Sequence, residues 1–117
     1  LNAAVYKSQV MLERVKLQQE QVTRLERELR DTRENLSDLR SHQLRITEIL
    51  GRVEAGIEAG VINEKERTSL KGELEVISQR EQRASSRETQ LANELETERA
   101  KLNELNDKLN LLVEREL

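Results

Sequence analysis

The sequence predicts an all-α protein that folds as a long antiparallel coiled-coil helical hairpin, a unit that can dimerise into a four-helix bundle. Three observations lead to this prediction. Tyr6 is the only aromatic residue, so the chain lacks the side chains that usually fill a compact core. The chain contains no proline, and 37% of its residues are charged. Apolar residues nevertheless recur every seven residues, which distinguishes a coiled coil from a disordered chain of similar composition.

The first helix is predicted over about residues 3–57. In its seven-residue frame, eleven of the fifteen a and d positions between residues 8 and 57 are apolar, against six of the other thirty-five positions. This contrast indicates a narrow apolar stripe, the pattern of a coiled-coil seam. Neither proline nor glycine interrupts residues 8–50, so the whole stretch is compatible with helix.

The second helix is predicted over about residues 63–116, and ten of the thirteen a and d positions between residues 70 and 112 are apolar. Its weakest stretch is EQRASSRE, residues 81–88, where Glu81, Ala84 and Glu88 occupy the seam. Two interpretations are open for such polar seam positions. Either their side chains extend out of a thin two-helix seam and weaken it, or they fix register and oligomeric state or mark a flexible hinge.

The predicted helix–helix seam takes its apolar residues from both frames. It comprises Val15, Val22, Leu25, Leu29, Leu36, Leu39, Ile46, Leu50, Val53, Ile57, Leu70, Leu74, Ile77, Leu91, Leu95, Leu102, Leu105, Leu109 and Leu112.

A turn is predicted at about residues 58–62, because the two heptad frames are out of phase by three residues there. A stammer within a continuous helix is the alternative explanation of such a slip. The local residues favour a break. Gly56 and Gly60 are each candidates for the left-handed residue that ends a helix, and Asn63 followed by Glu66 is a capping-box variant that begins one. Residues 1–117 are therefore predicted to form a single elongated module.

Two registers are compatible with the facing seams. When the numbers of paired residues add to 120, Leu25 meets Leu95 and Leu29 meets Leu91, and the layers are mostly apolar. When they add to 127, the flanking charges match better, with Glu26 near Arg99. Exposed ion pairs contribute only about 0.3–0.5 kcal/mol each, so the charges do not decide between the registers.

No catalytic constellation is recognisable, and the sequence predicts a protein that is not an enzyme and holds no metal or cofactor. His42 is the only histidine, and it occupies a flank position beside the seam. Gly56 and Gly60 follow no predicted strand and lack the Lys-Ser/Thr pair of a phosphate-binding loop.

The charge pattern bears on partners. The formal net charge is −3 and both signs are interspersed, which predicts no nucleic-acid binding. No apolar run approaches the roughly 20 residues of a membrane span, so no membrane insertion is expected within this segment. The expected partners are proteins, including a second copy of the chain in a homodimer.

The seam glutamates carry a further expectation. Apolar surroundings favour the protonated form of a carboxyl group, so the folded pKa of Glu81, Glu88 and Glu98 is expected to lie above the unfolded value. The protein would then become more stable as the pH falls towards about 4.

The segment RVEAGIEAGVINEKE, which begins at Arg52, resembles the hairpin tip of bacterial periplasmic adaptor proteins, the membrane-fusion components of efflux and secretion machines. In that family an arginine is followed by leucine four residues later and by serine after seven more, with an apolar residue before the serine and an acidic one after it. Arg52, Ile62, Asn63 and Glu66 match in place or kind, whereas Gly56 replaces the leucine and Asn63 the serine. The resemblance implies a bacterial periplasmic or cell-envelope location and a tip that contacts a partner through Arg52 and Ile57. Any anchoring sequence would lie upstream of Leu1.

Three functions are compatible with these observations. The first is a non-enzymatic coiled-coil module that acts as a spacer, scaffold or self-association element. The second is the hairpin of a periplasmic transport or secretion adaptor that docks a partner through its tip. The third is a parallel dimeric signalling stalk of continuous helices, in which the phase slip is a functional stammer.

Overall fold

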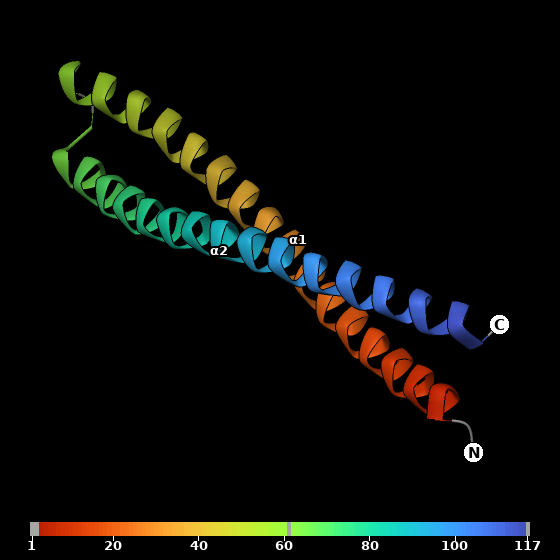
Figure 1. Ribbon diagram of the computed structural model, residues 1–117. Coiled ribbons are helices and arrows are strands. Elements are labelled where there is room, and N and C mark those ends of the chain that lie inside the picture. Colours follow the sequence, from red (N-terminus) through yellow and green to blue (C-terminus); the bar gives the residue numbers. More distant parts are fainter. Residues whose placement is uncertain (1–2, 61, 117) are drawn as a thin grey trace. The chain divides into compact units, whose positions relative to one another are not determined.

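Two long α-helices account for almost all of the chain in the computed structural model, which describes residues 3–60 and 62–116. Helix α1 spans Ala3–Glu58 and helix α2 spans Glu64–Glu116, and the described residues contain no strand. The chain reverses direction between the two helices (Figure 1). The all-α class and the helical hairpin are thus confirmed, and the continuous helix required by the signalling-stalk alternative is not what the structure shows.

The residues divide into two compact units, and both helices contribute to each of them. Unit 1 comprises Leu1–Arg30 and Thr89–Leu117, and it includes both ends of the chain. Unit 2 comprises Asp31–Glu88 and contains the turn, the green part of the ribbon in Figure 1. Within each unit the segments of α1 and α2 lie side by side and run antiparallel.

The core of unit 1 is a cluster of aliphatic side chains contributed by both helices. Its buried members are Val22, Leu25, Leu29, Leu91 and Leu95. Of these, Leu25 is only 1% exposed and Leu91 is 0% exposed. Burying one such side chain stabilises a fold by about 1.5–3 kcal/mol, so this cluster is the main stabilising feature of unit 1.

The core of unit 2 has the same character but is thinner. Its buried apolar residues are Leu36, Ile46, Val53, Ile77 and Ala84, and of these only Leu36 is as fully buried as the centre of the unit 1 cluster. Ala84, with its small side chain, is the only buried residue within residues 81–88, so this stretch buries little apolar surface. Helix α2 nevertheless continues through these residues without interruption.

The cross-helix contacts in both units follow the register in which paired residue numbers add to about 120. In unit 1, Leu25, Leu29, Leu91 and Leu95 share one cluster. In unit 2, the pairs Arg33–Glu88, Arg40–Glu81 and Gln43–Ser78 all add to 121. The Glu26–Arg99 ion pair was expected in the register with a sum of 127, but it forms in the adopted register too, with a distance of 3.4 Å. It forms because both residues are e positions, which face each other beside the seam in this register too.

Candidate interaction site at the hairpin turn

The end of α1 is closed by a left-handed glycine. Gly60 has a φ of +74°, and its N–H donates to the carbonyl of Ile57 at 3.0 Å. The N–H of Ile62 donates to the carbonyl of Gly56 at 3.2 Å and the N–H of Ala59 to that of Ala55 at 3.0 Å, so three of the last carbonyls of the helix have backbone donors. This arrangement resembles a Schellman ending, in which glycine is favoured because it has no Cβ to clash.

Gly56 serves a different purpose from the one that the sequence suggested. It lies within α1, and its φ is not positive, so the prediction of a left-handed residue at Gly56 is wrong. A Cβ atom at this position would lie 2.5 Å from Cδ1 and 2.9 Å from Cγ1 of Ile62. The side chain of Ile62 therefore packs directly on the bare Cα of Gly56, and this contact closes the turn against the end of α1.

Asn63 is the N-cap of α2. Its Oδ1 accepts a hydrogen bond from the N–H of Lys65 at 3.1 Å, which satisfies one of the free donors of the first turn. Glu64 and Glu66 place negative charge in that turn, where the helix dipole favours it. Only half of the predicted capping box forms, because among the described residues the Glu66 carboxylate makes no hydrogen bond to the Asn63 N–H.

The two predicted tip-contact residues do not converge on one site. Arg52 is exposed, and Ile57 is half-buried in the seam. They are five residues apart, which places them about 140° apart around the helix. Within the described part of the chain, Arg52 makes no ion pair. A partner at the turn would therefore meet the Arg52 guanidinium on the side of α1, with Ile57 supporting the helix from inside.

The predicted seam residues are all withdrawn from solvent to some degree. Those that are buried are Val15, Val22, Leu25, Leu29, Leu36, Ile46, Val53, Ile77, Leu91 and Leu95. Those that are half-buried are Leu39, Leu50, Ile57, Leu70, Leu74, Leu102, Leu105, Leu109 and Leu112.

Two of the seam glutamates in unit 2 reach out to arginines of α1. The Glu81 carboxylate lies 3.2 Å from Nε of Arg40, and the Glu88 carboxylate lies 3.6 Å from Nε of Arg33. The glutamate side chains are 25% and 32% exposed, so both ion pairs lie at the edge of the seam. Pairs in such a position contribute at most about 1 kcal/mol each, and they do not replace the apolar packing that leucines would supply.

Glu98 is a seam carboxyl group of unit 1 whose pKa is shifted. Gln18 Nε2 donates to the carboxylate of Glu98 and, at 3.0 Å, to its backbone carbonyl. This hydrogen bond lowers the pKa of Glu98, and Lys101 at 3.3 Å adds to the effect, against the opposing influence of burial. The expectation of a raised pKa is wrong for Glu98. The sequence could reveal the Gln18 partner only once the register was known.

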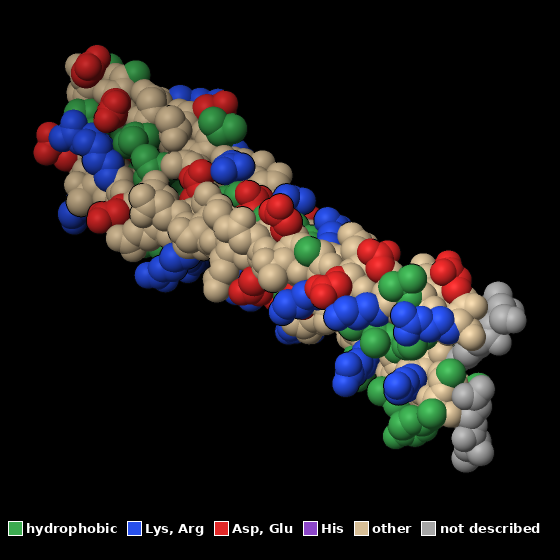
Figure 2. Space-filling model, in the orientation of Figure 1, with side chains coloured by type: hydrophobic (Ala, Val, Ile, Leu, Met, Phe, Trp, Pro, Cys, Tyr) green, Lys and Arg blue, Asp and Glu red, His purple; other side chains and the backbone are tan. Residues whose placement is uncertain are grey.

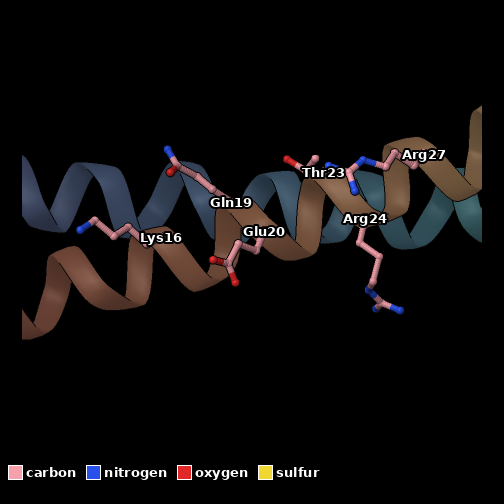
Figure 3. A pocket seen from close by; sticks show the side chains of 6 residues that line it. All are labelled: Lys16, Gln19, Glu20, Thr23, Arg24 and Arg27. Atoms are coloured by element: carbon pink, nitrogen blue, oxygen red, sulfur yellow. The ribbon is translucent and has the colours of Figure 1, made fainter.

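The described residues include one histidine and no candidate metal-binding cluster. His42 is exposed, and no group of three or more His, Asp or Glu side chains is arranged to hold a metal ion in the described part of the chain. A shallow depression on α1 in unit 1 is lined by Lys16, Gln19, Glu20, Thr23, Arg24 and Arg27. Figure 3 shows that these side chains point in different directions along one helix rather than towards a common point. They form a solvated helix face and not a convergent site.

A second depression lies in unit 2 above Ala84. It is lined by Thr32, Asn35 and Leu39 of α1 and by Arg80, Arg83, Ala84 and Arg87 of α2.

Neither helix, over the residues described, is long and apolar enough to cross a membrane. Comparisons with protein-family models, with curated proteins and with solved structures find no match to this chain.

Proposed function

We propose that this chain is a non-enzymatic coiled-coil module that serves as a spacer, scaffold or self-association element. The observation that supports this proposal most directly is the distribution of buried residues. Every buried aliphatic side chain in the described residues lies on the heptad stripe between α1 and α2. The polar side chains that line the depression of Figure 3 do not converge as those of a small-molecule site do.

Self-association follows from the thinness of this core. A seam between two helices covers each helix on one side only, and large aliphatic side chains remain exposed on both. Packing two such hairpins against each other in a four-helix bundle would cover part of that surface. Sedimentation equilibrium over a range of concentrations tests the proposal. We expect a dimer that dissociates on dilution, whereas a monomer at every concentration would leave only the spacer role.

A second candidate function is partner docking through the turn, as in the periplasmic adaptor hairpins that the segment resembles. Two features favour it. The described residues of the turn are held by Gly60, by the Asn63 cap and by the Gly56–Ile62 contact. Arg52 stands beside the turn as an exposed cation without an ion pair in the described residues. In this function the protein belongs to a bacterial envelope complex.

The two candidates differ in what Arg52 does. Replacing Arg52 with alanine should leave self-association unchanged, because the residue lies outside the seam. If the turn docks a partner, however, the same substitution should weaken capture of that partner by the full protein in cells. Arg45→Ala is the matched control, since Arg45 is also exposed on α1 but lies two turns further from the turn. Equal partner capture by both variants would reject docking through Arg52.

A further inference from the structure

Exposed aliphatic side chains gather at the end of unit 1 that carries both chain ends. Of the ten large hydrophobic residues exposed in the described part of the chain, seven lie within residues 5–17 or 111–113. The hydrophobic side chains visible at this end are drawn in green in Figure 2. Beneath them, Leu105, Leu109 and Leu112 are only half-buried, in contrast to Leu25 and Leu91 at the centre of the unit. The apolar seam is therefore incompletely covered here, and it continues onto the surface.

Apart from Tyr6, the exposed hydrophobic residues of this end lie on two flanks of the helix pair with different electrostatic character, Val5, Leu12 and Val113 on the first flank and Val10, Leu17 and Leu111 on the second. The Glu26–Arg99 ion pair marks the first flank, because both residues are e positions and lie 3.4 Å apart. Each step of seven residues towards the chain ends keeps the same flank. From Glu26 the steps lead to Gln19, Leu12 and Val5, and from Arg99 they lead to Asn106 and Val113. We call these five residues the neutral flank.

The neutral flank is unusual in a chain with so many charges. None of its five residues is charged, and Val5, Leu12 and Val113 are 38%, 42% and 42% exposed. The neighbouring outward row holds Gln9, Lys16, Asn103 and Asn110, of which only Lys16 is charged. The amides in both rows can donate and accept hydrogen bonds, so they can pair with identical amides of another copy.

The opposite flank is basic. Its g positions at this end are Lys7, Arg14, Lys101, Lys108 and Arg115. Two acidic side chains offset them in part, since Glu98 pairs with Lys101 at 3.3 Å and Glu104 pairs with Lys108 at 3.2 Å. Figure 2 shows Lys and Arg side chains, in blue, among hydrophobic ones at this end. Two copies that met through this flank would bring like charges together, which disfavours association.

We propose that the neutral flank of unit 1 is the surface on which a second copy of this chain docks. This inference rests on the self-association proposed above and adds the face that mediates it. A two-fold interface places the same patch of both copies in contact, and a neutral patch meets its own copy without repulsion. In the resulting four-helix bundle Leu12 and Val113 enter the core, and the half-buried seam leucines of this end are covered.

A pair of matched double variants tests the inference by sedimentation equilibrium. L12E/V113E places two carboxylates on the neutral flank. The control, L17E/L111E, adds the same charge to exposed leucines of the basic flank, which are 65% and 55% exposed. Since a carboxylate at a buried apolar interface is strongly unfavourable, we expect the first variant to raise the dimer dissociation constant by about 100-fold or more. The control should change it by less than about threefold, because its side chains stay in solvent.

A second variant of the neutral flank distinguishes a specific loss of dimerisation from misfolding. Q19K/N106K changes two polar residues of the flank, the exposed Gln19 and the half-buried Asn106, without removing an aliphatic side chain, so it should weaken the dimer while circular dichroism stays unchanged. A wild-type protein that is monomeric at every concentration would overturn both the self-association and the inference. A wild-type dimer that the control disrupts, or that Q19K/N106K and L12E/V113E leave intact, would preserve self-association but refute the neutral flank.

Discussion

Substituting the glycines of this chain one at a time gives a quantitative test of how the turn is closed. Gly51 and Gly72 lie within helices, and a Cβ atom added at either would meet nothing within 4 Å. Alanine at these positions should stabilise the protein by about 0.5–1 kcal/mol, because it removes the entropic penalty of glycine in a helix. For a chain of this length, 1 kcal/mol corresponds to about 4 °C in Tm.

Gly56→Ala should behave differently, although Gly56 is also helical. Its new Cβ would lie 2.5 Å from Cδ1 of Ile62, so the favourable helix propensity is opposed by a steric clash. Overpacking of this kind costs about 1–3 kcal/mol, and we expect a net destabilisation of about 0–2 kcal/mol. The free energy of unfolding of Gly56→Ala should therefore lie about 1–3 kcal/mol below that of Gly51→Ala.

A double-mutant cycle with Ile62→Ala identifies the cause. That substitution removes Cδ1 and Cγ1, the two atoms nearest to the added Cβ. In the Ile62→Ala background, Gly56→Ala should become stabilising by about the same 0.5–1 kcal/mol as Gly51→Ala. Thermal and urea unfolding followed by circular dichroism give the free energy of unfolding of the wild-type protein, the two single variants and the double variant. The explanation is refuted if Gly56→Ala stabilises the wild-type protein as much as Gly51→Ala does.

Three further predictions concern the caps and the polar seam. Asn63→Ala should destabilise the protein by about 1 kcal/mol in urea unfolding, whereas Asn63→Asp should keep most of the cap. Glu81→Leu should raise the free energy of unfolding by about 1–2 kcal/mol, because burial of leucine outweighs the exposed pair with Arg40, and a fall would show that the ion pair is the stronger contribution. The pKa of Glu98 is lowered from 4.5, so the stability gained from its ionised form is present at neutral pH and is lost as the pH falls through the lowered folded value. Gln18→Leu should therefore flatten the acid limb of the stability profile between pH 5 and about 3, and an unchanged limb would contradict the role of this hydrogen bond.

The helices and the turn could be predicted from the sequence because their signals are local. A seven-residue apolar period defines a stripe wherever it occurs, and a glycine and an asparagine three residues apart are sufficient to end one helix and begin another. The turn required no knowledge of tertiary contacts. The contact that closes the turn could not be predicted in this way, because the role of Gly56 depends on where the Ile62 side chain lies after the chain has reversed.

The electrostatic details could not be predicted for a related reason. Glu26 and Arg99 approach each other in the adopted register through their e positions, so their attraction did not discriminate between the registers. The pKa of Glu98 depends on Gln18, which is eighty residues away in the sequence and becomes a partner only through the pairing of the helices. Burial alone predicted the opposite direction, because it neglects the donor that the opposite helix supplies.

A distance between spin labels at Glu13 and Asp107 tests the antiparallel pairing on which the account depends. Both residues are exposed in unit 1, and the chain has no native cysteine to interfere with labelling. With labelled protein diluted into excess unlabelled chain, the account predicts an intramolecular distance of about 20–30 Å, the scale of two packed helix diameters with the label arms. The absence of an intramolecular distance in this range would contradict it, since a continuous helix would separate the labels by about 140 Å.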